Sequence, residues 1–291
     1  MSQVGYDALA RPRGGFAMIA IDARESMRGL FRDAGRPSDD GDLSSFKRVA
    51  AQELGSLASA VLCDPVYGSD AIATMRDDHP DTGLIVAVDA FDEPRFGPLR
   101  ESRLDEAAMA AAVAGGGVAA LKLYLFWRPG ADEVARLDDA RRFIERCQEL
   151  GVLSLLEGVV AVQPGDPRFD DALVRAAEGF GALSPDVYKT QLPTFGRGDD
   201  ETVEREARRV SDAVGVPWVV LSNGVDAPRF PAAVAAACRG GASGLLAGRG
   251  IWRPALSAAD PVAELATGGR ARLRELIDIV DTHARPWSQV V

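Results

Sequence analysis

The sequence predicts an α/β fold, a (β/α)₈ TIM barrel that forms one domain over residues 1–291. Short, near-continuous apolar runs, typical of buried parallel strands, recur eight times along the chain. Amphipathic stretches of helical period separate these runs, and no Pro-, Gly- or Ser-rich linker divides them. Alternating strands and helices favour a parallel sheet, and a count of eight strands favours its closure into a barrel.

The expected strands follow one another from residue 16 to residue 248. They are Phe16–Asp22, Ala58–Asp64, Leu84–Asp89, Val118–Phe126, Val152–Glu157, Asp186–Gln191, Pro217–Ser222 and Ala242–Gly248. The clearest expected helix is Asp132–Leu150, in which apolar side chains recur near a period of 3.6 and Gly151 stands at the stop. Further helices are expected at Asp199–Val214, Ala227–Arg239 and Pro261–His283.

Composition and charge exclude several classes of partner. The chain carries a net charge of −10, which argues against nucleic acid and anionic membranes but not against a small anionic substrate. Its three cysteines (Cys63, Cys147 and Cys238) fit neither a disulfide framework nor a metal-site spacing. The first 15 residues lack the apolar core of a signal peptide, and no apolar run reaches about 18 residues. These features predict a cytoplasmic protein.

Lysine is scarce in this chain and unusually placed. Of 33 basic residues only three are lysines, and Lys122 and Lys189 interrupt apolar, strand-like runs. A desolvated lysine can lose its proton and act as a nucleophilic amine, which arginine cannot do. The alternative is a buried structural ion pair. The third, Lys47, is expected on a surface helix, with no role.

Two lysines and a glutamate fall on three consecutive expected strands. Lys122, Glu157 and Lys189 can converge on one reacting atom, because neighbouring strands lie about 4.8 Å apart. Lys122 shares its strand face with Ala120 and Tyr124. Repulsion between the two ammonium groups would lower the pKa of one of them, and the glutamate could transfer protons. The alternative is a Lys–Glu–Lys ion cluster that holds the barrel interior.

Acidic residues end several strands, where the active sites of such barrels lie. Asp22 is read as a candidate site residue. Asp64 and Asp89 are interpreted instead as N-caps of the helices that follow them.

The ends of the last two strands suggest an anion site. Ser222-Asn-Gly224 follows the seventh strand and Gly248-Arg249-Gly250 the eighth, where barrels commonly bind phosphate. The Arg249 guanidinium would add a bidentate partner for phosphate or sulfonate. The alternative is an ordinary turn with an exposed arginine.

Six segments carry a family resemblance that runs over essentially the whole chain. They are Phe16-Ala-Met-Ile-Ala-Ile-Asp22-Ala-Arg24-Glu-Ser-Met27-Arg28, Ala120-Leu-Lys122, Leu155-Leu-Glu157, Asp186-Val-Tyr-Lys189, Pro217-Trp-Val-Val-Leu-Ser222-Asn-Gly-Val-Asp226 and Gly241-Ala-Ser-Gly-Leu-Leu-Ala-Gly-Arg249-Gly-Ile-Trp252. Together they resemble the class I aldolases that comprise sulfofructose 1-phosphate aldolase and tagatose 1,6-bisphosphate aldolase. The last segment looks closer to the sulfosugar branch.

The resemblance implies a role for each matching position. Lys189 would form the Schiff base, Glu157 would transfer protons, Lys122 would be the second lysine, and Asp22 would bind substrate hydroxyls. The candidate substrate- and phosphate-binding residues are Ser222, Asn223, Gly224, Gly248, Arg249 and Arg24. No metal or other cofactor is implied, because the iminium would withdraw electrons from the substrate, as zinc does in class II aldolases.

The implied reaction is cleavage of 6-deoxy-6-sulfofructose 1-phosphate to dihydroxyacetone phosphate and 3-sulfolactaldehyde. Ala23 and Gln191 depart from the family pattern where the aldehyde half would sit, which leaves the distal anion open. The alternatives are tagatose or fructose 1,6-bisphosphate cleavage, a phosphosugar epimerase or isomerase, and a non-catalytic sugar-phosphate-binding barrel. A homo-oligomer is expected.

Overall fold

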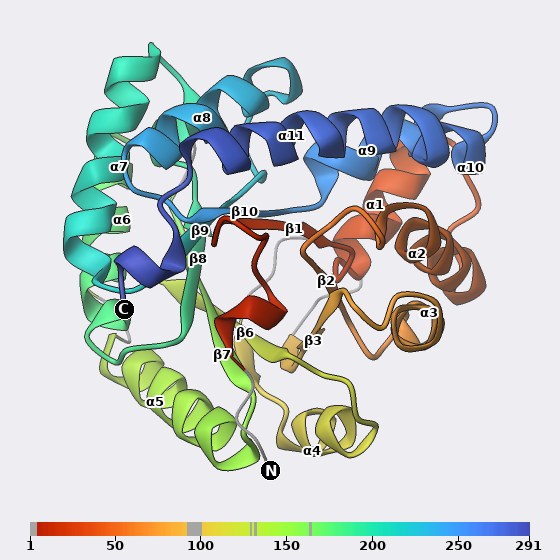
Figure 1. Cartoon of the computed structure of the whole chain (residues 1–291), viewed down its shortest axis with the longest axis horizontal. Helices are drawn as coiled ribbons and strands as arrows, with labels where there is room; N and C mark the ends of the chain where they lie inside the picture. Colours follow the sequence, from red (N-terminus) through yellow and green to blue (C-terminus); the bar gives the residue numbers. More distant parts are fainter. Residues whose placement is uncertain (1–4, 92–100, 129, 131–132, 163–164) are drawn as a thin grey trace.

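Eight parallel strands close into a barrel, as the sequence predicts (Figure 1). The computed structural model describes residues 5–91, 101–128, 130, 133–162 and 165–291. Around the barrel the strands run in the order β1-β10-β9-β8-β7-β6-β3-β2. Their bounds are β1 Phe16–Ala20, β2 Ala60–Cys63, β3 Gly83–Ala87, β6 Ala120–Trp127, β7 Leu153–Val160, β8 Val187–Gln191, β9 Trp218–Leu221 and β10 Gly244–Ala247.

Helices surround the strands (Figure 1). They are α1 Glu25–Asp33, α2 Asp40–Leu54, α3 Ser69–Asp78, α4 Glu106–Ala114, α5 Glu133–Leu150, α6 Phe169–Gly181, α7 Asp200–Val214, α8 Phe230–Arg239, α9 Arg249–Ser257, α10 Pro261–Glu264 and α11 Arg270–His283. The helix expected at Pro261–His283 is interrupted by a π-helical turn at Leu265–Gly269, where two glycines stand together. None of the described helices is long and apolar enough to cross a membrane.

Side chains alternate between the barrel interior and the helical layer. On β6, Leu121, Leu123 and Leu125 pack into the core under the helices, while Ala120 joins the interior cluster. Lys122 lies on the same face as Ala120, because successive strand residues point to opposite sides. The interior is therefore apolar at the amino ends of the strands and polar at their carboxyl ends.

The two ends of the chain close the amino end of the barrel. Leu9 belongs to the interior cluster, and Tyr6 and Trp287 pack against it with their rings stacked at 4.8 Å. Arg11 binds the Asp281 carboxylate through two hydrogen bonds of 2.7 Å. A ligand must therefore enter from the opposite end.

A small antiparallel pair follows β3 at that opposite end. Its strands are β4 (Asp89–Phe91) and β5 (Ser102–Leu104), with Asp89 paired to Leu104. The Phe91 ring of β4 packs edge-on against the Tyr124 ring of β6, with 5.5 Å between the ring centres. Asp89, expected at the end of the third strand, instead begins this added strand.

Candidate active site

A cavity of about 220 Å³ opens at the carboxyl ends of the barrel strands. Nine of the ten residues predicted to form the site line it: Asp22, Arg24, Lys122, Glu157, Lys189, Ser222, Asn223, Gly248 and Arg249. Phe91, Tyr124 and Trp252 supply aromatic walls. The cavity thus lies where barrels of this kind hold their active sites.

The Glu157 carboxylate lies between the two buried lysines. Its Oε2 atom is 3.0 Å from Lys189 Nζ and 3.1 Å from Lys122 Nζ. Strand register produces this contact, because Glu157 on β7 pairs with Lys189 on β8 and with Tyr124 on β6. All three charged residues are at most 5% exposed.

Lys122 sits among three carboxylates. Its Nζ atom lies 2.8 Å from Asp22 Oδ2, 2.8 Å from Asp89 Oδ2 and 3.1 Å from Glu157 Oε2. Burial by itself would lower the pKa of Lys122, but these carboxylates outweigh it and raise that pKa well above its usual value. Lys122 is therefore a fixed ammonium ion, and the expected lowering of its pKa by repulsion does not occur. The sequence predicts only Glu157 beside the two lysines, and folding brings Asp22 and Asp89 to Lys122 as well.

The two aspartates beside Lys122 respond in opposite ways. Burial would raise the pKa of Asp22, but the cations of Lys122 and Lys189 prevail and lower it. For Asp89, burial is the largest influence and raises the pKa, against the opposing effect of Lys122 and Arg24. Asp22 therefore stays ionised, whereas the charge of Asp89 depends on the cations that hold it.

The opposite side of the cavity offers an arginine at a helix start. Arg249 is the first residue of α9, and Gly248 precedes it without a side-chain cap. Among the described residues no carboxylate lies within ion-pair distance of Arg249, and burial lowers its pKa. A Cβ atom at Gly248 would lie 2.2 Å from the Ala20 carbonyl oxygen, so only glycine fits there. The Gly250 N–H points to Ser222 Oγ at 3.4 Å.

Residues 16–254 match the model of the DeoC/LacD family aldolases. This chain belongs to that family. It is 26% identical to tagatose 1,6-diphosphate aldolase from Listeria monocytogenes serotype 4b, over 97% of this chain and 92% of that protein. Tagatose 1,6-diphosphate aldolase 2 from Enterococcus faecalis is 25% identical, over 98% and 95%. Fructose-bisphosphate aldolase from Slackia heliotrinireducens shares the fold, with a TM-score of 0.62 and 18% identity over 95% of this chain and 88% of that chain.

The aldolase cavity departs from the sequence interpretation at Gly224 and Arg24. Gly224 does not line the cavity; it has a φ of +81°, and an added Cβ would lie 2.7 Å from the Phe195 ring. It shapes the turn after β9. Arg24 does line the cavity, but its NH1 donates to the Asp89 carbonyl at 2.8 Å and its NH2 lies 3.3 Å from Asp89 Oδ1. Its charge is therefore already compensated.

Gln191 is not at the position that sequence comparison suggested. Its side-chain oxygen accepts from the Val160 N–H at 2.8 Å, and its amide nitrogen donates to the Val160 carbonyl at 3.3 Å. It extends the β7–β8 pairing, and it is not among the cavity-lining residues, whereas Ala23 is.

The N-cap interpretation of Asp64 and Asp89 is wrong. Gly68 is the N-cap of α3, and Asp64 Oδ1 accepts from the N–H groups of Val66 and Tyr67 within the preceding turn. Asp89 holds Lys122 and Arg24.

The sequence predicts Lys47 on a surface helix, and this prediction is wrong. It lies on α2, is fully buried, and pairs with Asp64. A signal was present in the sequence, because Lys47 falls in line with Leu43, Ala50 and Leu54 at helical spacing. All three lysines of this aldolase are therefore buried.

Proposed function

We propose that this aldolase works through a Schiff base on Lys189. The observation that carries the proposal is the Glu157 carboxylate, which contacts both Lys189 and Lys122 inside the cavity. The Lys189 amine would add to the C2 carbonyl of a ketose 1-phosphate, and loss of water would leave an iminium. Cleavage of the C3–C4 bond then places its electron pair in the iminium as an enamine, while the C4 hydroxyl loses its proton and becomes the aldehyde. Protonation at C3 and hydrolysis release dihydroxyacetone phosphate.

The charged neighbours of Lys189 support this chemistry. Glu157 can accept and return protons because it already shares a hydrogen bond with the amine. Lys122 holds Glu157 and Asp22 in place, and Asp22 remains an ionised acceptor for substrate hydroxyls. These roles match those that the resemblance implies.

Borohydride trapping tests the mechanism. Incubation with dihydroxyacetone phosphate and borohydride should give a stable adduct on the Lys189 peptide, detected by mass spectrometry. Lys122 and Lys47 lie on other peptides and serve as internal controls. An adduct on Lys122, or none, would refute the assignment, and absence of cleavage with absence of an adduct would favour the epimerase or isomerase alternative.

We assign the C1 phosphate to Arg249 and the start of α9. The guanidinium there has no carboxylate partner among the described residues, and a helix N-terminus favours an anion. Arg249→Ala should raise KM for the sugar phosphate about tenfold or more, with a smaller change in kcat. Arg253→Ala is the matched control, since Arg253 lies one turn later on the same helix and is exposed. Equal effects of the two variants, or an unchanged KM, would place the phosphate elsewhere.

The distal group of the substrate is a sulfonate in our proposal, so the substrate is 6-deoxy-6-sulfofructose 1-phosphate and the second product 3-sulfolactaldehyde. The glycine-rich segment that ends at Arg249 supports this through its resemblance to the sulfosugar branch. Tagatose 1,6-bisphosphate is the second candidate, because the relatives above are tagatose 1,6-diphosphate aldolases. Steady-state kinetics on both substrates decide between them, and a higher kcat/KM on the bisphosphate overturns the sulfonate assignment.

A further inference from the structure

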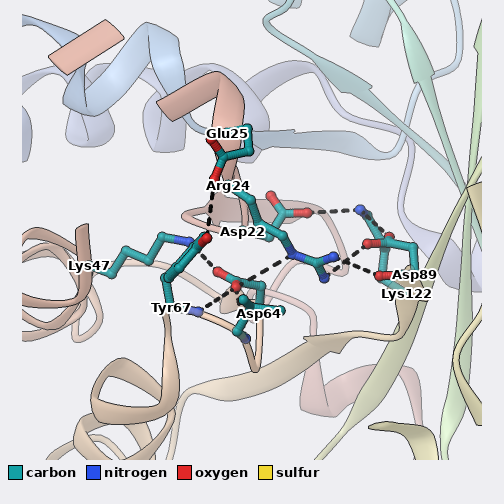
Figure 2. Close-up of polar contacts among 9 residues, drawn as sticks. Asp22, Arg24, Glu25, Lys47, Asp64, Tyr67, Asp89 and Lys122 are labelled. Atoms are coloured by element: carbon teal, nitrogen blue, oxygen red, sulfur yellow. Dashed lines mark hydrogen bonds and ion pairs between the residues drawn. The ribbon is translucent and has the colours of Figure 1, made fainter. Parts of the chain in front are cut away.

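A chain of alternating charges leads from Lys47 on α2 to Lys122 in the cavity (Figure 2). Lys47 pairs with Asp64, and Asp64 Oδ1 lies 3.5 Å from Arg24 Nε. Arg24 in turn binds Asp89, and Asp89 binds Lys122. Every member of this chain is at most 9% exposed.

Arg24 is shared between two carboxylates. Its Nε lies 3.5 Å from Asp64 Oδ1 and its NH2 lies 3.3 Å from Asp89 Oδ1, while its NH1 donates to the Asp89 backbone carbonyl at 2.8 Å. The guanidinium therefore has two contacts with Asp89 and one with Asp64. Phe91 supports this placement, with its ring 5.3 Å from the guanidinium carbon. A shift of Arg24 toward Asp64 would come at the expense of Asp89.

Lys47 compensates the charge of the Asp64 carboxylate, which also faces Arg24. Asp64 is fully buried, and its Oδ2 is occupied by Lys47 while its Oδ1 accepts from two backbone N–H groups. Without the Lys47 ammonium, a buried carboxylate would be left to find its compensating cation in Arg24. Figure 2 shows Arg24 between the two aspartates, with Lys47 approaching Asp64 from the far side.

We propose that Lys47 is a positioning residue of the aldolase: by neutralising Asp64 it leaves Arg24 to hold Asp89 as the ionised partner of Lys122. The proposal rests on the proposed function for its catalytic consequence. Lys47 touches no substrate and acts through three intervening side chains. It also explains why α2, which contributes no residue to the cavity lining, carries a fully buried lysine.

The proposal predicts a pH effect centred on Asp89. The charged groups that face Asp89 are Lys122 from β6, Arg24 from the segment between β1 and α1, and Asp22 after β1. Burial already raises the pKa of Asp89, and Arg24 opposes that rise. Loss of Arg24 from Asp89 raises its pKa further, so Asp89 takes up a proton at higher pH.

Lysine-selective NMR can follow this event directly. The chain has only three lysines, so protein labelled with ¹³Cε-lysine gives three side-chain signals, assigned with the Lys→Met variants. The Lys122 signal should change when Asp89 takes up a proton, and this change is called the Lys122 transition. In Lys47→Met the Lys122 transition should occur at a pH about one unit higher than in the wild type. The acid limb of kcat should follow it, with KM little changed.

A second variant separates positioning from simple stabilisation. Lys47→Met/Asp64→Asn removes both charges, and the asparagine oxygen can still accept from the two N–H groups of the turn. Asp89 is then the only carboxylate that Arg24 compensates, so the pKa of Asp89 should fall. The Lys122 transition should therefore occur at a lower pH than in the wild type. Should Lys47→Met fail to fold, this double variant alone decides, and an unmoved transition overturns the proposal.

Leu54→Ala is the control for lost packing. Leu54 is fully buried on the same helix, two turns after Lys47, and is outside the charge chain. It should lower thermal stability and leave the Lys122 transition in place. A Lys47→Met variant that behaves in the same way would show that Lys47 is only structural. Because the NMR signal needs no turnover, wild-type protein without aldolase activity would refute the proposed function and not this coupling.

Discussion

Replacing Lys189 with methionine should abolish carbon–carbon bond cleavage while the barrel stays folded. We expect kcat to fall by about 10⁴-fold or more, because the variant has no amine to form the iminium. Methionine has a similar volume without the charge. Glu157 keeps Lys122 as a cation partner at 3.1 Å, so it is not left as an unpaired buried charge. Steady-state kinetics, circular dichroism and a thermal melt measure the two effects.

Lys189→Arg is the matched control. It keeps a positive charge beside Glu157 but supplies no nucleophilic amine. Both variants should be inactive and should give no borohydride adduct, with the arginine variant closer to wild type in stability. Cleavage above about one part in a hundred of the wild-type rate in a folded Lys189→Met protein would show that another group is the nucleophile.

Lys122→Met should cost both activity and stability, and the loss of stability should depend on pH. The change leaves Asp22, Asp89 and Glu157 facing one another without the ammonium they share. Breaking a buried ion cluster in this way costs about 3–5 kcal/mol. The pKa of Asp89, already raised by burial, loses the largest influence that lowers it.

The sign of the pH dependence follows from these directions. A carboxyl group whose native pKa lies above its unfolded value costs stability as pH rises through that native pKa. Lys122→Met should therefore be destabilised more at pH 8 than at pH 5. In the wild type the raised pKa of Lys122 means that its stabilising charge is present throughout this range. Urea melts of both proteins at the two pH values measure the difference.

The Lys122→Met/Asp89→Asn variant provides the control. Removing one carboxylate together with the ammonium should recover part of the stability and flatten its pH dependence. Catalysis should not recover, because Glu157 still lacks its second cation. Schiff-base trapping in Lys122→Met should also be slower than in the wild type at the same pH, since Glu157 then pairs with Lys189 alone. Trapping at the wild-type rate would show that Lys122 does not assist Lys189.

The barrel could be predicted because its signals are local. All eight strands were expected within a few residues of their observed bounds, since each is a short apolar run with turn residues beside it. The interruption at Leu265–Gly269 was not expected, although the paired glycines that accompany it were visible. The spacing of apolar residues along a helix does not reveal a single extra residue in one turn.

The convergence of Lys122, Glu157 and Lys189 was also within reach of the sequence. They stand on neighbouring strands, and alternation places them on one face, so local geometry determines that they meet. Asp89 was misread because the chain leaves the barrel after Ala87 and forms the antiparallel β4–β5 pair, which turns its side chain onto Lys122. No periodic pattern announces that turn.

The barrel and the two lysines with their glutamate could be predicted from the sequence alone, because periodicity and strand order are properties of neighbouring residues. The family was indicated separately, by the resemblance of six segments. The charges around the lysines, in contrast, depend on contacts between distant parts of the chain. The tertiary structure brought Asp22 and Asp89 to Lys122, and buried Lys47 against Asp64. These contacts join residues 17 to 100 positions apart, and in a buried site such partners decide the sign of each pKa change.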